Sequence, residues 1–510
     1  MNERKPLAWS DFQLLTLALG LLGCIALFHL GSAAAGKSYY RDIHLGTALE
    51  FARTRIDIFH PIIVGFNATQ TPTPQELPLW QAAAALGFKV LGPWFGWANL
   101  ISLLLFSTCL FPLYQLAKAY GGTRCACWTL VFFLAEPLVF LHAGLASTDG
   151  FSLASTIWFL FAAVRLLQTS RPIWWLLACA TGTVAIVSKL PFFMAAGLTI
   201  FLLTVCSYRT SLRAWLLMGS IAAFTGVVFF AWTGYANRCL ALAEFPYVDL
   251  RASSSNMVFW YFGDLHFRLS PGPWVKGAWR MLNACFGSMA LAGLSVVSLL
   301  FLQKNTFAKL WLAGAVLTTL VFTHLVLHHW HYFLMFTPAI ALLCASTAVA
   351  WEKSLACDSR GKSHLAMGVV ALALLLSLAQ GLVGMKIVLF QDPFEKKMVE
   401  IIKTHSSEAD KMLIAGGSWG GEELFLGHRQ GLSIWNTQLL EDPAHRLRLK
   451  ELGYNKLVMI SQSPLLVAAQ AVNPGEGGAP RKSYREFMTP AVTNWPTLYE
   501  NEDILIKEIP

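Results

Sequence analysis

The chain has 510 residues, of which 55% are hydrophobic and only 13% are charged. This composition excludes an ordinary soluble globular protein and indicates that much of the chain lies in lipid. The formal net charge of +9 follows from the membrane topology described below, so it does not indicate a nucleic-acid-binding surface.

About eleven apolar stretches approach the length of roughly 20 residues that a helix needs to cross a bilayer. They lie near residues 12–30, 95–117, 125–143, 151–169, 173–188, 191–207, 213–233, 281–302, 308–327, 332–350 and 365–388. The first is too long for a signal peptide and lacks a small-residue cleavage site, so we expect a retained helix.

The basic residues of the short loops give the orientation, because cytoplasmic loops carry an excess of Lys and Arg. With the N-terminus inside, every inner loop is basic, whereas the outer loops 143–150 and 328–331 contain neither Lys nor Arg. We therefore predict a multi-pass protein of a bacterial inner membrane, with a cytoplasmic N-terminus and a periplasmic C-terminal domain.

The first outer loop, 31–92, contains two short amphipathic helices separated by a proline-rich segment. Residues 39–53 have apolar side chains at helical spacing and are expected to lie along the membrane interface. The prolines between 61 and 78 end this helix and favour an extended path, and a second short helix is expected at 80–90. The second outer loop, 234–280, carries Asp264, His266 and Arg268 without a spacing that identifies a reaction.

The tail, 391–510, has the pattern of a small soluble α/β domain, and we assign 1–390 to the membrane domain. Residues 411–415 and 456–460 look like buried strands, and Asp442 and Pro443 suit the N-cap and first turn of a helix that ends at Leu452. The glycine-rich segment 416–421 lacks the Lys-Ser/Thr pair of a phosphate-binding loop, so a turn is the better interpretation.

Two acidic residues at the predicted outer interface are the main candidates for chemistry, because a carboxylate there needs water, a cation or a function. Asp42 follows the first span, and Asp149 begins the fourth. The alternatives are a solvated carboxylate on an amphipathic helix for Asp42 and a helix N-cap for Asp149, which is compatible with a functional role.

Several cations and histidines lie at the same predicted interface. His328 and His331 share a helical face and could bind a metal, but an interfacial belt with Tyr332 or a phosphate-contacting role is the preferred interpretation. Lys189, between two apolar segments, either extends idly to the interface or attracts an anionic lipid head group.

This layout resembles the GT-C superfamily of polyprenyl-phosphate-sugar glycosyltransferases, in particular the branch of the protein O-mannosyltransferases and the lipid A aminoarabinose transferase. The resemblance covers most of the chain, but its motifs are short. They are Asp42-Ile43-His44 at the start of an amphipathic helix, Glu76-Leu77-Pro78-Leu79-Trp80, Thr148-Asp149-Gly150, Ser188-Lys189-Leu190-Pro191 and His331-Tyr332-Phe333. Ile43 stands where the family often has a second acid, and Gln75-Glu76 where it usually has Lys-Pro.

The resemblance implies transfer of a sugar from a polyprenyl-phosphate donor to a glycolipid, envelope glycan or protein on the periplasmic side, with inversion by single displacement. Asp42 is then expected to be the base and Asp149 a supporting acid. The expected substrate-binding residues are Tyr40, Arg41, His44, Glu76, Trp80, Lys189, His266, Arg268, His328, His331 and Tyr332. The sequence demands no cofactor, although a divalent metal is compatible with this chemistry.

A multi-span transporter or flippase of an envelope lipid or glycan is the main alternative, because intramembrane charges and about eleven spans also suit one. It predicts inverted repeats and polar residues near the bilayer midplane. The sequence has no evident internal repeat and its polar residues gather towards one face, which favours the enzyme over the transporter and over a third class, a non-catalytic scaffold.

Overall fold

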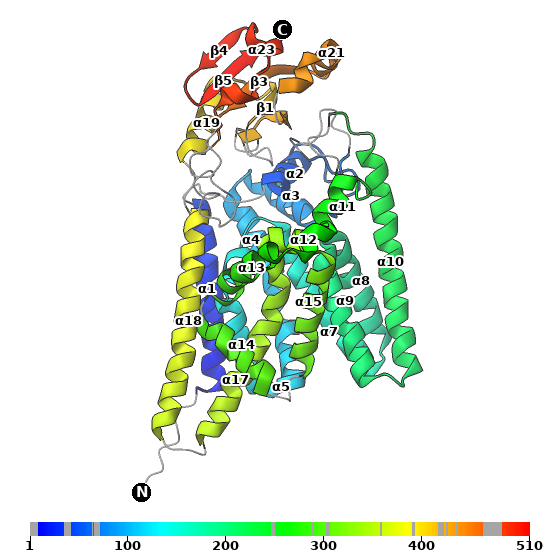
Figure 1. Ribbon diagram of the computed structural model, residues 1–510, viewed down its shortest axis with the longest axis vertical. Coiled ribbons are helices and arrows are strands. Elements are labelled where there is room, and N and C mark those ends of the chain that lie inside the picture. The colour runs from blue at the N-terminus through cyan, green and yellow to red at the C-terminus, as the bar shows by residue number, and fades with distance from the viewer. Residues whose placement is uncertain are drawn as a thin grey trace. The chain divides into compact units, whose positions relative to one another are not determined.

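The computed structural model describes residues 9–510 except 35–41, 64, 66–71, 246–249, 288, 302–305, 357–359, 390–392, 417–422, 425–426, 435–436 and 463–481. It divides into two compact units, each built from separate parts of the chain (Figure 1). The first comprises residues 1–35, 99–232 and 258–387, and the second comprises residues 36–98, 233–257 and 388–510.

The first unit is helical. Its main helices are α1 (Asp11–Ala34), α4 (Phe95–Ser107), α5 (Leu110–Ala135), α6 (Pro137–His142), α7 (Thr148–Thr169), α8 (Pro172–Ser188), α9 (Leu190–Ser207), α10 (Leu212–Leu240), α14 (Met289–Phe301), α15 (Thr306–Val321), α16 (Thr323–His328), α17 (Thr337–Ala356) and α18 (Arg360–Leu389). Shorter elements connect them: α11 (Ser255–Phe262), α12 (Leu265–Leu269), α13 (Pro271–Met281), the π-helix η1 (Leu282–Phe286) and the 3₁₀ helix η2 (Trp330–Phe336). Each stretch predicted to span the membrane contains helix.

Six helical stretches in the described part of the chain are long and apolar enough to cross a membrane, or seven if the bent pair at 271–300 counts as one span. This number is lower than the eleven or so predicted. Residues 96–135 count as one apolar stretch, although Gly122 breaks the helical conformation within it. Four further apolar stretches have 10–17 described residues, and one of them, 368–383, is part of the 30-residue α18. The described part of the chain therefore has the long apolar helices expected of a membrane protein.

Local sequence explains the breaks between two pairs of consecutive helices in this unit. Between α8 and α9 only Lys189 leaves the helical conformation. Pro191 lies in the first turn of α9, where its missing backbone N–H costs nothing because first-turn N–H groups have no partner within the helix. Between α5 and α6, Glu136 is extended and Pro137 opens α6. Because α7 runs away from Asp149 and α8 returns to Ser188, Asp149 and Lys189 come to the same end of these helices.

The second unit is built on a five-stranded mixed sheet with the order β2-β1-β3-β5-β4. The strands are β1 (Lys411–Ala415), β2 (Gln430–Ile434), β3 (Tyr454–Ile460), β4 (Thr497–Glu500) and β5 (Ile504–Glu508). The first three pair in parallel, and β5 pairs antiparallel with both β3 and β4. The two strands predicted from the sequence are β1 and β3, and the mixed sheet confirms an α/β domain.

Both faces of the sheet are covered by apolar side chains. On one face Leu413, Leu457 and Met459 pack with Leu449 of α21 (Pro443–Glu451), a helix that Asp442 caps by accepting the Ala444 N–H at 2.8 Å. On the other face Met398 and Ile402 of α19 (Pro393–Thr404) pack on Met412, Ile414 and Val458. The remaining helical elements here are η3 (Thr437–Glu441), η4 (Tyr484–Phe487) and α23 (Pro490–Thr493).

Most of the first predicted outer loop and the beginning of the second, up to residue 257, belong to this second unit together with the tail, whereas residues 258–280 belong to the first unit. The first loop contributes α2 (Asp42–Arg53) and α3 (Leu79–Leu91), and Gly65 extends the sheet edge by exchanging backbone hydrogen bonds with Gly431 and Ser433. The second loop adds an ion pair between Glu244 and Arg448, at 3.0 Å. Of the three segments predicted to leave the membrane, the second is therefore divided between the two units.

Candidate functional site

A cluster of polar side chains surrounds the first turn of α7. The hydroxyl of Ser147 caps the helix by accepting the backbone N–H of Asp149 at 3.4 Å, and it donates to Asp149 Oδ2 at 3.2 Å. Asp149 is therefore not the N-cap, which was one of the two interpretations of its sequence. Its carboxylate is turned into the protein and is available for other contacts.

Gly150 allows α7 to begin directly beside the end of α6. A Cβ atom at this position would lie 2.6 Å from the carbonyl oxygen of His142, a distance that real Cβ atoms do not adopt. The close approach brings His142 Nδ1 to 3.5 Å from Asp149 Oδ2. This distance is long for a hydrogen bond, but it places the imidazole against the carboxylate.

Lys189 reaches the same carboxylate from the break between α8 and α9. Its ammonium group lies 3.2 Å from Asp149 Oδ1 and 5.4 Å from the centre of the Tyr332 ring, a cation–π geometry. Tyr332 is held in turn by an edge contact with Phe192 of α9. Residues far apart in the sequence thus converge on one ion pair.

This ion pair is enclosed by protein, since the exposed fractions of the Lys189 and Asp149 side chains are 1% and 0%. Removing two charges from water costs about as much as their attraction returns, so such a pair is weak evidence for a purely stabilising role. Buried ionisable residues in membrane proteins more often mark sites for ligands, ions or protons. The geometry supplies a cation, a carboxylate and an imidazole at the end of an apolar helix bundle.

The histidines of the 328–331 segment do not share a helical face, contrary to the prediction. The α-helix ends at His328, His329 is extended, and His331 belongs to the 3₁₀ helix η2. As a result His328 is exposed, while His331 is fully buried with its ring 4.5 Å from that of Tyr332. No group of three or more His, Cys, Asp or Glu within the described ranges could hold a metal ion.

The candidates of the second outer loop have different surroundings. His266 is exposed on α12, whereas the Arg268 guanidinium donates hydrogen bonds to the carbonyls of Phe262 at 2.8 Å and Val321 at 2.9 Å. These bonds hold α12 against the end of α15. An anion that recruits Arg268 would have to compete with two carbonyl acceptors.

The first-loop candidates lie in the second unit. His44 of α2 and the fully buried Trp80 of α3 are 6.3 Å apart in an edge-to-face contact, and His44 Nδ1 is hydrogen-bonded to Gln81 at 2.9 Å. Asp42 opens α2 and Glu76 is half-buried before α3. Tyr40, Arg41 and the side chain of Asp42 lie outside the described residues.

Sequence reasoning missed His142 and Ser147 as members of the cluster. Their only signal was weak: His142 is a single imidazole in an apolar run, seven residues before Asp149. A titratable group within a membrane segment is expensive to bury, and that cost is the sequence feature that could have marked it.

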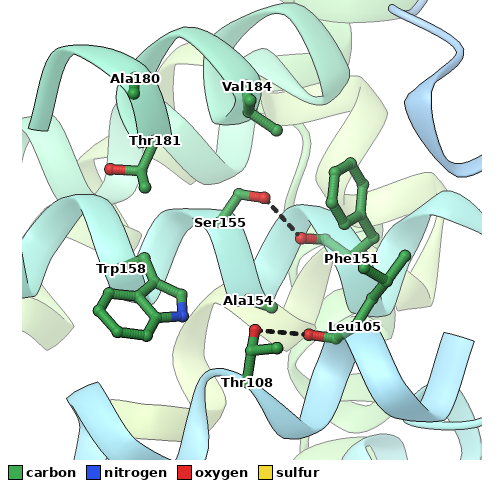
Figure 2. A pocket seen from close by; sticks show the side chains of 9 residues that line it. All are labelled: Leu105, Thr108, Phe151, Ala154, Ser155, Trp158, Ala180, Thr181 and Val184. Atoms are coloured by element: carbon green, nitrogen blue, oxygen red, sulfur yellow. Dashed lines mark hydrogen bonds between the residues drawn. The ribbon is translucent and has the colours of Figure 1, made fainter. Parts of the chain in front are cut away.

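An apolar pocket of about 260 Å³ opens between α4, α7 and α8 (Figure 2). It is lined by Leu105, Thr108, Phe151, Ala154, Ser155, Trp158, Ala180, Thr181 and Val184. Its three hydroxyls bond to carbonyls of their own helices, with distances of 2.7 Å for Thr108, 2.9 Å for Ser155 and 2.6 Å for Thr181. Apart from the indole N–H of Trp158, the lining therefore offers a ligand mainly hydrocarbon contact.

The fold and the cluster together define a polytopic helical membrane protein with a polar cluster at one end of its bundle. Comparison with protein-family models finds no match, and comparison with curated protein sequences finds none either.

Comparison with solved structures finds several similar membrane enzymes. ArnT from Cupriavidus metallidurans bound to undecaprenyl phosphate aligns with a TM-score of 0.60 and 12% identity, covering 98% of both chains. An Archaeoglobus fulgidus oligosaccharyltransferase aligns with a TM-score of 0.56 and 10% identity, covering 89% of this chain and 70% of its own. The mycobacterial arabinofuranosyltransferase AftD aligns with a TM-score of 0.51 and 15% identity, covering 89% of this chain and 35% of its own.

These three proteins are GT-C glycosyltransferases. At these identities the likeness concerns the fold, and it extends over nearly the whole chain in the case of ArnT. This chain is therefore a membrane protein with the GT-C fold, as its sequence motifs predicted.

Proposed function

We propose that this chain is a membrane glycosyltransferase that moves a sugar from a polyprenyl-phosphate donor to a glycolipid, glycan or protein acceptor. The observation that carries the proposal is the buried Lys189–Asp149 ion pair at one end of a GT-C helix bundle. The reaction takes place on the periplasmic side of a bacterial inner membrane, which is where the basic inner loops place this end of the helices.

In this reaction the bond between the anomeric carbon and the phosphate oxygen breaks, and a bond from the acceptor oxygen to that carbon forms. The leaving phosphate gains negative charge, which a nearby cation stabilises in the transition state. Lys189 supplies that charge, because its ammonium group can exchange Asp149 for phosphate while Tyr332 holds the lysine side chain in place. A single displacement inverts the configuration at the anomeric carbon.

The acceptor hydroxyl loses a proton, and carboxylates are the groups that take it. Asp42 is assigned as the base on the family resemblance, with Asp149 orienting the acceptor or sharing the proton transfer. The absence of a second acid beside Asp42, where Ile43 stands, gives Asp149 more weight than the family pattern alone.

The apolar pocket supports a lipid-linked donor. Phe151 is two residues beyond Asp149 on α7, and Val184 is five residues before Lys189 on α8. At about 3.6 residues per turn, the pocket begins roughly half a turn from Asp149 along α7 and roughly one and a half turns from Lys189 along α8. A lipid with its phosphate at Lys189 would place its first isoprene units beside this hydrocarbon lining.

The test is transfer by the purified chain in proteoliposomes, with synthetic polyprenyl-phosphate pentoses and hexoses as donors and extracted envelope lipids as acceptors. Mass spectrometry of the products is the readout. The wild type is expected to transfer at least one sugar, and Asp42→Asn or Lys189→Gln is expected to lower turnover by about 10²-fold or more.

Asp442→Asn is the matched control, because asparagine also caps a helix and Asp442 lies in the sheet domain. Retained transfer by Asp42→Asn would remove that residue as the base. If the wild type transfers no sugar from any donor, and an envelope lacking the chain has unchanged glycans and lipids, the transferase proposal is wrong.

A further inference from the structure

A row of histidine rings leads from the exposed His328 of the first unit to the buried ion pair, and the buried His324 stacks on His328 at its outer end. Its members are His324, His328, His329, His331 and His142, contributed by α16, η2, the residue between them and α6. Successive ring centres are 5.3, 5.0, 5.3 and 6.3 Å apart. The row ends at His142, whose Nδ1 lies 3.5 Å from Asp149.

The exposure of these rings changes along the row. His328 is exposed, His329 is half-buried, and His331 and His142 have exposed fractions of 0% and 1%. Asp149 itself has no exposed surface. A proton that reaches the Asp149 carboxylate therefore has no direct route to solvent, whereas the histidines from His142 to His328 form a route along which the exposed fraction of the rings rises.

Ring centres about 5 Å apart bring imidazole nitrogens within hydrogen-bonding reach when the rings turn, and neutral imidazole is both donor and acceptor. The wider step between His331 and His142 needs a ring rotation or one bridging water. Imidazole also changes its charge near neutral pH, so it suits repeated uptake and release of protons.

The shape of the row argues against its simplest alternatives. A metal site needs its ligands around one point, and no group of three or more metal-binding side chains in the described part of the chain does so. Ordinary aromatic packing does explain Trp260, which contacts His324, His328 and His329. It does not explain why the row continues to a buried carboxylate.

We infer that the row is a proton relay that connects Asp149 with solvent at His328. The inference rests on the proposed transferase function and extends it. In the share of the proton transfer that falls to Asp149, the acceptor hydroxyl gives its proton to this carboxylate as its oxygen bonds to the anomeric carbon. The electron pair of the broken carbon–oxygen bond stays on the leaving phosphate. His142, His331 and His329 then pass a proton outward, and His328 releases it to water.

Other charged and titratable groups surround this path and will shape its pH dependence. They are Lys189 beside Asp149, Tyr332 beside His329 and His331, His29 of α1 beside His142, Arg280 of α13 bonded to the Leu327 and His328 carbonyls, and Arg268 bonded to the Val321 carbonyl before α16.

The relay predicts that substitutions become more harmful towards the buried end. In the proteoliposome assay His331→Gln is expected to lower turnover by about tenfold or more, and His328→Gln by a smaller factor. The loss should change the pH profile and raise the solvent deuterium isotope effect. Free imidazole should restore His329→Ala, whose position is half-exposed. His445→Gln, an exposed histidine on α21, is the control.

A second readout needs no sugar transfer. A light-activated compound releases protons into the solvent, and infrared spectroscopy follows the band of the protonated Asp149 carboxyl group. This band is assigned by its loss in Asp149→Asn. It should appear several-fold later in His331→Gln than in the wild type. If that band appears equally fast, or if the histidine variants lose activity equally at every pH without rescue by imidazole, the relay is wrong. If the wild type transfers no sugar but the band is delayed in His331→Gln, the proton path is supported and the transferase proposal is wrong.

Discussion

At the scale of single residues, the Lys189–Asp149 pair decides what the buried cluster can do. Either charge alone would be left uncompensated inside the protein, which typically costs about 3–5 kcal/mol, while removing both costs much less. We expect Lys189→Met and Asp149→Asn each to lower the free energy of unfolding strongly, and the double variant to lose less than the sum. The free energies of unfolding of the wild type, the two single variants and the double variant form a double-mutant cycle, which reversible unfolding in mixed micelles measures. Strict additivity would show that the two side chains do not interact.

Glu136, between α5 and α6, is a second buried acid with a different prediction. Its exposed fraction is 1%, and neither carboxyl oxygen has a hydrogen-bond partner among the described residues. An unsatisfied buried polar group costs about 1–3 kcal/mol. Glu136→Met, which keeps the volume and removes the polar atoms, is expected to raise the thermal midpoint in detergent. A lower midpoint would mean that the carboxyl group makes a stabilising contact.

At the scale of elements, the start of α7 depends on its close approach to α6. Gly150→Ala would push a methyl group against the His142 carbonyl, and overpacking of this kind costs about 1–3 kcal/mol. We expect a lower thermal midpoint together with weaker sugar transfer, because the Asp149–His142 geometry changes. Gly219→Ala on α10 is the control: a Cβ there meets nothing within 4 Å, so alanine should be neutral or stabilising. Equal effects of both substitutions would contradict the role of this contact.

The loop before β1 predicts a pH dependence of stability. Burial, the largest single effect, raises the pKa of Asp410, but hydrogen bonds from the Ser407 N–H and Asn455 and the charge of Lys456 together bring this pKa below its ordinary value. A lowered folded-state pKa stabilises the fold above the unfolded-state pKa of about 3.9, and this contribution disappears as pH falls through the folded-state value. Asp410→Asn should therefore lower the thermal midpoint at neutral pH and approach the wild type in acid. A constant difference at all pH values would exclude this origin.

At the scale of the whole molecule, the orientation is the prediction to check first. Basic residues in every predicted inner loop predict a cytoplasmic N-terminus and a sheet domain outside. Alkaline phosphatase fused after Pro510 is expected to be active, whereas the same enzyme fused after Lys353 is expected to be inactive. A green fluorescent protein at these two positions should give the opposite pattern. Activity after Lys353 would reverse the topology and remove the periplasmic site.

Much of the architecture could be predicted from the chain because the forces that set it are local. The length of the apolar stretches predicts the membrane helices. The start of α21 follows from Asp442, which caps the helix, and from Pro443, which suits its first position. The break at Lys189 likewise follows from Pro191. These features depend on neighbouring residues and on the solvent, so one sequence is enough to identify them.

The site is different, since its members are contributed by separate helices. The sequence by itself determined that Asp149 and Lys189 would lie near one end of the helices, because helix direction alternates along the chain. Only the tertiary structure decided that Asp149 would pair with Lys189 instead of being solvated in a loop. It also decided that Ser147, and not Asp149, would cap α7. The close approach at Gly150 then brings His142 to the same carboxylate. Helix periodicity carries no information on which helices touch, because that choice depends on side-chain packing between segments distant in the sequence.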